Sequence, residues 1–246
     1  MNLTWFDSIS AELNGVPVRV ARTDYDKQRT SDSEIVSLKG QGFFSIYEKL
    51  LKDDPPRTIL EFGIFEGGSA LILAAMFPTA KIVGVDLRPS NPAVLRHVEK
   101  MGLADRVFLH YGVSQSNEAK IVDSIAAELG GSLDLVIDDA SHNYEQTKAS
   151  FEIGMPYVRE GGMYIIEDWA WAHWPGTGFD NWQGPALSNL VFELSMVTAS
   201  RPDIVGELRV RSSLVAALKG PHVSRARYRF DSLYKTAPRE WKRLAL

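Results

Sequence analysis

Three short stretches rich in acidic residues constrain the fold of this chain more than any other feature. Residues 61–68 are Glu-Phe-Gly-Ile-Phe-Glu-Gly-Gly, residues 138–142 are Asp-Asp-Ala-Ser-His, and the third stretch is Glu167-Asp168. Each follows directly on an apolar run that is typical of a buried strand. In an open parallel sheet the carboxyl ends of the strands form the crevice in which ligands bind. We therefore expect the three stretches to converge on one cleft.

Strand-like and helix-like runs alternate from Arg57 to Lys219. The predicted strands of the alternating part are Thr58–Leu60, Lys81–Val85, Val107–Tyr111, Leu133–Ile137 and Met163–Ile166. The predicted helices between them are Ser69–Phe77, Pro92–Met101, Glu118–Leu129 and Tyr144–Tyr157. Strands separated by helices indicate βαβ crossovers and therefore a parallel sheet. Two further β-like runs, Val205–Arg211 and Leu214–Lys219, predict an antiparallel C-terminal hairpin.

The expected fold class is therefore α/β: a Rossmann-like, mostly parallel sheet of seven strands with helices on both faces and an antiparallel C-terminal hairpin. A chain of 246 residues is long enough for one large domain of this kind. We expect a single domain in three parts. Residues 1–56 form an N-terminal helical and lid segment, residues 57–219 form the Rossmann-like core with a substrate loop at 169–186, and residues 220–246 form a basic C-terminal flank. The first segment is expected to hold an amphipathic helix around Trp5–Leu13 and a second helix within Ser33–Lys52.

Composition excludes several kinds of chemistry. The chain has no cysteine, so disulfides, thiolate catalysis and cysteine-bound metals are ruled out. The sequence has no start that resembles a signal peptide, and no apolar run approaches the roughly 20 residues that span a bilayer. We therefore expect a cytoplasmic protein without a membrane partner. Residues 201–246 hold eleven Lys or Arg against four Asp or Glu. We interpret them as a solvated flank, with a surface for an acidic partner as the alternative, and expect no nucleic acid.

A glycine-rich turn follows the first predicted strand. In the dinucleotide-binding fingerprint a glycine in the middle of such a turn lets the backbone meet a pyrophosphate, but here the middle residue is Phe65. This bulky side chain disfavours NAD and FAD and is compatible with a nucleoside that carries no phosphate. Asp86, twenty-three residues after Gly63, ends the second strand, where its carboxylate can accept hydrogen bonds from both ribose hydroxyls. Glu61 lies where the ammonium group of an amino-acid moiety could be bound.

The Glu61-Phe62-Gly63-x-x-x-Gly67-Gly68 and Gly84-Val85-Asp86 motifs resemble those of class I S-adenosylmethionine-dependent methyltransferases. This resemblance implies that the Gly63 turn cradles the methionine part of the cofactor and that Asp86 holds the ribose. The family often has an acidic residue after the third strand, near the adenine. Here the adenine contacts are expected from Ser114 or Gln115 instead. The candidate cofactor-binding residues are Glu61, Gly63, Phe65, Gly67, Ser69, Asp86, Ser114 and Asp138.

Acidic residues at the ends of the fourth and fifth strands suggest a metal site. Neighbouring parallel strands lie about 4.8 Å apart, so carboxylates at their ends can share one cation. Oxygen ligands favour Mg²⁺, or Mn²⁺ as a substitute. We expect Asp139, Glu167 and Asp168 as ligands and Asp138 turned into hydrogen bonds beneath the site. Because consecutive strand residues face opposite ways, Glu167 and Asp168 can both point inward only if the strand has ended. Helix capping or hydrogen bonding is the alternative role for these acids.

His142 lies three residues beyond Asp139, at the start of the next helix. A histidine beside a metal at the mouth of a cleft has the pKa range of a general base, so we predict that role for His142. The candidate substrate-binding residues are Trp169, His173 and Trp174. They belong to a loop whose other aromatic residues include Trp171, Phe179 and Trp182, and whose glycines suit a lid. Simple packing of the loop is the alternative.

A closer resemblance covers Leu133 to Gly176. The Asp138-Asp139-x-Ser141-His142 motif, the run ending in Glu167-Asp168, and His173-Trp174-Pro175-Gly176 are similar to the macrocin-type O-methyltransferases of actinomycetes. Those enzymes methylate sugar hydroxyls in natural-product biosynthesis and need Mg²⁺. The resemblance implies metal binding at Asp139, Glu167 and Asp168 and a base at His142. Because the chain is short for that group, its acceptor need not be a macrolide.

The sequence therefore predicts an O-methyltransferase that depends on S-adenosylmethionine and a divalent metal, and that transfers a methyl group to a sugar hydroxyl of a small-molecule or oligosaccharide substrate. The main alternative is a catechol or phenol O-methyltransferase with the same metal site. A nicotinamide-dependent dehydrogenase is disfavoured by Phe65. A non-catalytic binding protein with the methyltransferase fold is disfavoured by the set of acids with His142. Homo-oligomer formation is left open.

Overall fold

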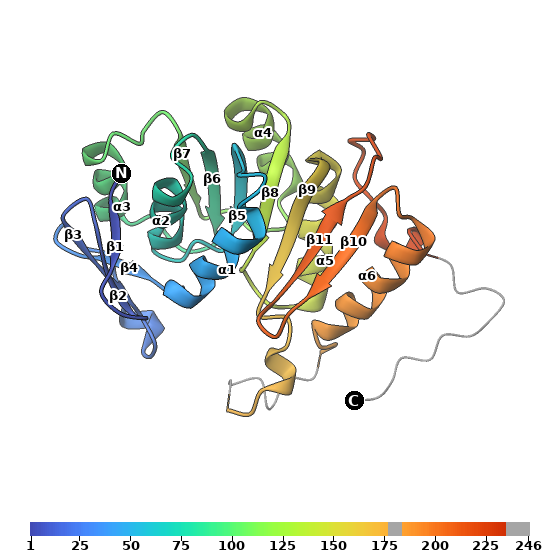
Figure 1. Cartoon of the computed structure of the whole chain (residues 1–246), viewed down its shortest axis with the longest axis horizontal. Helices are drawn as coiled ribbons and strands as arrows, with labels where there is room; N and C mark the ends of the chain where they lie inside the picture. The colour runs from blue at the N-terminus through green and yellow to red at the C-terminus, as the bar shows by residue number, and fades with distance from the viewer. Residues whose placement is uncertain (177–183, 235–246) are drawn as a thin grey trace. The chain divides into compact units, whose positions relative to one another are not determined.

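The computed structural model describes residues 1–176 and 184–234 (Figure 1). The chain divides into two compact units, Met1–Gly131 and Ser132–Leu246, and each is described by itself. Three features stay predictions: the organisation as a single domain, the interpretation of the basic C-terminal segment as a solvated flank, and the role of the 169–186 loop as a lid. Phe179 and Trp182 lie outside the described residues, as does the end of the basic flank.

The N-terminal segment is a small sheet and not the expected helix. Its strands are β1 (Leu3–Trp5), β2 (Ser10–Leu13), β3 (Val16–Val20) and β4 (Ile35–Ser37), in the order β1-β2-β3-β4. The first three are antiparallel, whereas β3 and β4 are parallel.

The predicted helix at Trp5–Leu13 is wrong because its Asn-Gly ending is a hairpin signal. Asn14 and Gly15 both have positive φ, 50° and 81°, as the tight turn between β2 and β3 requires. The Asp7 carboxylate accepts hydrogen bonds from the backbone N–H groups of Ile9 and Ser10, both at 2.7 Å, and so closes the turn before β2. The second predicted helix is shorter than expected: α1 is Gln41–Leu51, and β4 precedes it.

The rest of the first unit has the alternation that the sequence predicts. Its elements are β5 (Thr58–Phe62), α2 (Gly68–Met76), β6 (Lys81–Asp86), α3 (Pro92–Lys100), β7 (Val107–Tyr111) and α4 (Glu118–Leu129). β6 pairs in parallel with both β5 and β7. Strands β5 and β6 are largely apolar and buried, and helices α2 and α4 both pack on β6, whereas β7 is mostly half-buried. The carboxyl ends of β5 and β6 therefore carry Glu61 and Asp86 at the same edge.

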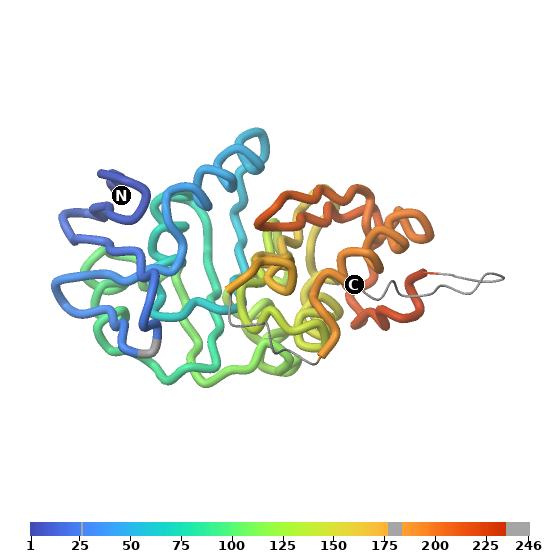
Figure 2. Tube along the Cα trace, turned by 90° about the horizontal axis from the view of Figure 1, so that it is seen from below, coloured from blue at the N-terminus to red at the C-terminus, as the bar shows by residue number. Residues whose placement is uncertain are grey.

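The second unit continues the pattern and closes it with antiparallel strands. Its elements are β8 (Leu133–Asp138), α5 (Tyr144–Gly154), a 3₁₀ turn at Met155–Tyr157, β9 (Val158–Glu167), a 3₁₀ turn at Trp171–His173, α6 (Ser188–Ser200), β10 (Val205–Val210), β11 (Leu214–Lys219) and a last 3₁₀ turn at Phe230–Ser232. β8 and β9 are parallel, and β11 is antiparallel to both β9 and β10. The tube in Figure 2 shows β10 and β11 running side by side.

The predicted fold class is confirmed. Strands β5 to β11 form a seven-stranded, mostly parallel sheet with an antiparallel C-terminal pair. Helix α6 was not predicted from the sequence. Its first residue follows Leu187, which offers no side-chain cap, so the usual start signal of a helix is missing.

Gly68 allows the first turn of α2 to pack on β4. A Cβ at this position would lie 2.2 Å from the backbone oxygen of Val36 and 3.1 Å from the Cα of Ser37. Because these neighbours are backbone atoms of a strand, they cannot move aside without disturbing the N-terminal sheet. Gly42 in α1 has no atom within 4 Å of an added Cβ and provides a matched comparison.

We expect Gly68→Ala to lower the free energy of unfolding by about 1–3 kcal/mol, as overpacking does. Gly42→Ala should leave it unchanged or raise it by up to about 1 kcal/mol, because alanine favours helix. Urea unfolding of both variants measures the difference. Equal stability of the two would contradict the close packing of α2 on β4.

Candidate functional site

The turn after β5 depends on left-handed backbone. Gly63, Phe65 and Gly67 have φ values of 81°, 52° and 78°. A Cβ at Gly67 would lie 2.7 Å from a methyl group of Val94 and 3.1 Å from the hydroxyl of Tyr111. Glycine is thus required at the start of α2, and Phe65 adopts a conformation that is costly for a bulky residue. Such strain is typical of ligand-binding turns.

Asp86 ties this turn to the end of β6. Its Oδ2 accepts a hydrogen bond from the backbone N–H of Phe65 at 2.7 Å, and its Oδ1 accepts one from the backbone N–H of Arg88 at 2.8 Å. Each carboxylate oxygen has a second lone pair, so Asp86 could still accept hydrogen bonds from the two ribose hydroxyls. The Arg88 guanidinium lies over the Phe65 ring, 4.5 Å from its centroid.

Glu66 is a buried carboxylate in the same turn, and its role is not evident from the sequence. It accepts hydrogen bonds from the backbone N–H of Thr30 at 3.2 Å and from the side-chain amide of Asn91 at 2.5 Å. Arg29 approaches it within 3.7 Å. These partners lie far away in the sequence, so no local motif marks the network. It fastens the segment before β4 to the glycine turn.

Glu61 is fully buried and forms an ion pair with Lys39. The Lys39 ammonium lies 2.8 Å from Glu61 Oε1, and the two side chains are 4% and 0% exposed. The sequence predicts a cofactor ammonium near this carboxylate. The structure places the lysine ammonium there, and a role of Glu61 in cofactor binding stays a prediction.

The remaining predicted cofactor residues of the first unit have different surroundings. Ser69 is buried in the first turn of α2, whereas Ser114 Oγ lies 3.0 Å from Ser116 Oγ in an exposed turn. The hydroxyl of Tyr111 is buried and has no hydrogen-bond partner among the described residues. Burial and the nearby acids raise the pKa of Tyr111, so it stays a protonated donor. This donor and the Gly67 turn provide a polar cradle without room for extra side chains.

We expect Lys39→Met to lower the free energy of unfolding by about 3–5 kcal/mol, because it leaves the Glu61 charge buried without its cation. Lys39→Met combined with Glu61→Gln should recover most of this loss. Chemical denaturation of the single and double variants tests the pair. A double variant no more stable than Lys39→Met would show that the loss comes from packing alone.

Asp138, the last residue of β8, is buried in the second unit. Its Oδ2 accepts hydrogen bonds from the hydroxyls of Ser150 and Tyr164, the latter at 2.8 Å. Burial raises the pKa of Asp138 to about 6 although both hydroxyls lower it. The side chain is thus engaged between α5 and β9, and its predicted contact with a cofactor stays a prediction.

Asp139, His142 and Asp168 form one group of possible metal ligands. One ligand atom from each residue lies within 4.8 Å of those from the other two, and His142 Nε2 is 3.7 Å from Asp139 Oδ1. Ligands on opposite sides of Mg²⁺ are about 4.2 Å apart, given bonds of about 2.1 Å. The spread of the three atoms is therefore close to what one ion needs.

The end of β9 explains which acid joins this group. β9 ends at Glu167, and Asp168 has a φ of 51°, so the alternation of the strand is broken between them. The backbone N–H of Asp168 donates to the Ser213 carbonyl at 2.8 Å, which holds the residue against the β10–β11 hairpin. Glu167 is 1% exposed and is not in the group. Its predicted role as a ligand stays a prediction.

His142 also has a left-handed backbone, with a φ of 51°. Its ring lies 4.2 Å from the Trp171 ring, centroid to centroid, at an angle of 39°. The Asn143 side chain next to it caps α5 by accepting from the N–H groups of Glu145 and Gln146. The imidazole is therefore held between the start of a helix and an aromatic side chain.

The predicted substrate residues lie beside this group in the chain. Trp169 donates from its indole N–H to the Arg211 carbonyl at 2.8 Å, and His173 Nε2 is 2.9 Å from Ser188 Oγ. Trp174 is half-buried. The first two side chains thus anchor their loop, and substrate contact by all three stays a prediction.

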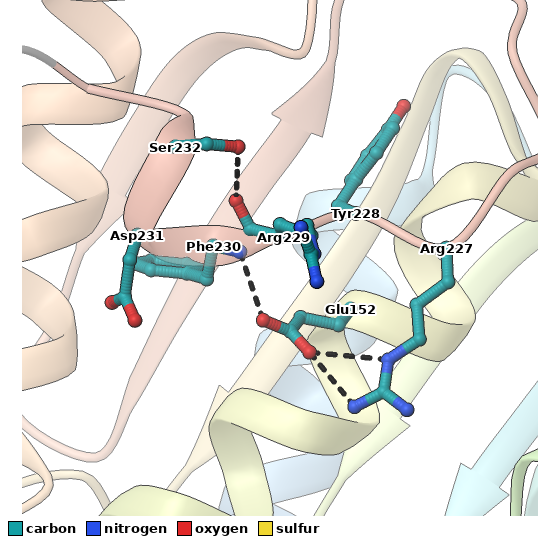
Figure 3. Close-up of a pocket in the computed structure, with 7 residues that line it drawn as sticks. All are labelled: Glu152, Arg227, Tyr228, Arg229, Phe230, Asp231 and Ser232. Atoms are coloured by element: carbon teal, nitrogen blue, oxygen red, sulfur yellow. Dashed lines mark hydrogen bonds and ion pairs between the residues drawn. The ribbon is translucent and has the colours of Figure 1, made fainter.

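A separate cavity of about 820 Å³ lies on the C-terminal flank (Figure 3). It is lined by Glu152, Arg227, Tyr228, Arg229, Phe230, Asp231 and Ser232. Glu152 accepts hydrogen bonds from the Arg227 guanidinium and from the backbone N–H of Phe230. None of the predicted site residues lines this cavity.

In the described part of the chain, no helix is both long and apolar enough to cross a membrane.

Part of the core matches a known family. Residues 60–169 match a family model described as a methyltransferase domain. This stretch contains the glycine turn, Asp86, and the group of Asp139, His142 and Asp168. Both candidate sites thus lie within the matched region.

Particular relatives narrow the resemblance. Mycinamicin VI 2''-O-methyltransferase of Micromonospora griseorubida is 35% identical over 127 residues, which are 49% of this chain and 29% of the relative. Demethylmacrocin O-methyltransferase of Streptomyces fradiae is 32% identical over 147 residues, 56% of this chain and 34% of the relative. The solved structure of MycE methyltransferase from the mycinamycin pathway, in complex with Mg, SAH and mycinamycin VI, is 27% identical. Its TM-score is 0.54, with 72% of this chain and 49% of MycE covered.

The chain therefore spans about a third of the length of these curated relatives and about half of MycE. The predicted resemblance to the macrocin-type O-methyltransferases is confirmed.

Proposed function

We propose that this chain is an S-adenosylmethionine-dependent and divalent-metal-dependent O-methyltransferase that acts on a sugar hydroxyl. The observation that carries the proposal is the group of Asp139, His142 and Asp168 within a matched methyltransferase domain. The names of further relatives support the sugar acceptor, since they are O-methyltransferases of an L-olivosyl-oleandolide and of two α-L-rhamnosyl-tetracenomycins. A histidine beside the acids also suits an aliphatic hydroxyl better than a phenol, which is already acidic.

The residues of the first unit fit a nucleoside cofactor without phosphate. The left-handed turn at Gly63 to Gly67 is of the kind whose backbone a ligand can approach closely, and Asp86 retains acceptor capacity on both oxygens. The Tyr111 hydroxyl, which has no hydrogen-bond partner among the described residues, adds a donor beside Gly67. In this proposal these residues bind the cofactor, and Asp86 orients its ribose.

In the second unit, Asp139 and Asp168 would hold the metal, with Glu167 as the third predicted ligand. When bound, S-adenosylmethionine supplies an electrophilic methyl group on a sulfonium, and the divalent cation supplies positive charge that lowers the pKa of a hydroxyl. His142 Nε2 accepts the proton as the oxygen of the acceptor becomes the nucleophile. Asp139, 3.7 Å away, stabilises the imidazolium that results. The proton then leaves to solvent.

We expect His142→Ala to bind S-adenosylmethionine as the wild type does and to lose methyl transfer by about 10²–10⁴-fold, the usual contribution of a general base. Calorimetry measures cofactor binding, and transfer of radiolabelled methyl to a panel of glycosides measures the rate. Mn²⁺ affinity distinguishes the two roles open to His142. An unchanged affinity fits a base, whereas a large loss would make His142 a metal ligand instead.

We expect Asp139→Ala to abolish Mn²⁺ binding, measured by electron paramagnetic resonance, and to remove the activation that Mg²⁺ gives after EDTA treatment. Asp203→Ala, which removes an exposed acid paired with Arg201, is the matched control and should retain both. A wild-type protein that binds neither S-adenosylmethionine nor its demethylated product would refute the proposed function.

A further inference from the structure

Helix α6 contacts both segments that flank His142. Glu193 accepts a hydrogen bond from the Tyr144 hydroxyl, which lies 2.9 Å and 2.7 Å from its two oxygens. Tyr144 is the first residue of α5, two positions after His142. On the other side, Ser188 Oγ lies 2.9 Å from His173 Nε2. His173 ends the short 3₁₀ turn that begins with Trp171, whose ring lies against the imidazole of His142.

Glu193 is a carboxylate at a buried position of α6, where apolar residues are usual. Glu193 is 1% exposed and Tyr144 is 2% exposed. The neighbouring buried positions of α6 are apolar, among them Leu190, Leu194 and Val197. A carboxylate loses its hydration on burial, whereas an apolar side chain of similar size would pack without that loss. What the carboxylate adds is direction, since it fixes the position of the phenol.

The start of α5 needs such a fixed point. His142 has a φ of 51°, a conformation that persists only where the surroundings over-determine it. The Asn143 cap fixes the helix hydrogen bonds, but it does not place the helix relative to the rest of the unit. The Tyr144 hydroxyl does so, because it ties the first residue of α5 to a different helix.

We propose that Glu193 and Tyr144 are positioning residues for His142. They hold the left-handed turn so that the imidazole stays beside Asp139 and against Trp171. Ser188 supports the Trp171 side of the same arrangement. This inference rests on the proposed function, in which His142 accepts the proton of the acceptor hydroxyl.

The central test is a double-mutant cycle with His142. Glu193→Gln retains the size of the side chain, and Tyr144→Phe removes a single hydroxyl. Each should lower kcat by about 10- to 100-fold, as loss of a supporting hydrogen bond around a site does, with KM for the acceptor and the Kd for the cofactor unchanged. In the His142→Ala background neither change should lower the remaining transfer rate further. An equal loss in both backgrounds, or a wild-type kcat in Tyr144→Phe, would overturn the inference.

Glu152→Gln is the matched control, because Glu152 is a carboxylate at the other end of α5. It accepts hydrogen bonds from Arg227 and from the backbone of Phe230 (Figure 3). We expect this variant to lower the stability of the flank and to leave kcat as in the wild type. A loss of kcat as large as that of Glu193→Gln would mean that any disturbance of α5 suffices, and would also overturn the inference.

A readout without turnover separates this inference from the proposed function. The imidazole signals of His142 can be assigned in the NMR spectrum by their absence from His142→Ala. Tyr144→Phe should shift or broaden them, whereas Glu152→Gln should not. If the wild type transfers no methyl group to any acceptor, the proposed function fails. The inference then depends on the NMR result alone, and unchanged His142 signals in Tyr144→Phe would overturn it.

Discussion

Left-handed backbone at the ends of strands is the constraint on which the candidate sites depend. The chain turns through φ values of about 50° at Phe65, His142 and Asp168, directly after β5, β8 and β9 or within a few residues of them. For a residue with a Cβ this conformation costs roughly 1–2 kcal/mol. In return it breaks the alternation of the strand, so that side chains which would face opposite sides can be grouped. Asp168 is the clearest case, because it follows the last residue of β9 and yet joins Asp139 and His142.

Each of these turns is held by a polar group that comes from elsewhere in its unit. Asp86 accepts the backbone N–H of Phe65, and the Ser213 carbonyl accepts that of Asp168. Next to His142, Glu193 holds Tyr144. Buried polar groups stabilise a structure only when they are hydrogen-bonded. For Glu193 and Tyr144, the hydrogen bond that permits their burial therefore also fixes the turn next to α5.

The N-terminal sheet supports the cofactor turn more closely than a lid would. Gly68 packs on the backbone of β4, Lys39 neutralises the buried Glu61, and Thr30 donates to Glu66. The segment predicted as a helical cover is thus part of the structural support of the turn. A ligand at Asp86 would bind beside a framework made by two segments distant in the sequence.

The sequence by itself determined the parts of this protein that depend on local chemistry. The apolar runs and the helices between them predicted β5 to β9, α2 to α5 and the C-terminal hairpin, because periodic patterns of apolar residues report burial directly. The motifs around Gly63, Asp86, Asp139 and His142 predicted the class of chemistry, because each motif combines residue types and spacing that are local in the sequence. The tertiary structure alone decided that the Trp5–Leu13 region is a sheet, that α6 exists, and that His142 rather than Glu167 groups with Asp139 and Asp168. It also paired Lys39 with Glu61 and Tyr144 with Glu193. These outcomes depend on partners far apart in the sequence, and the energy of burying a charge or straining a backbone is decided only when those partners meet.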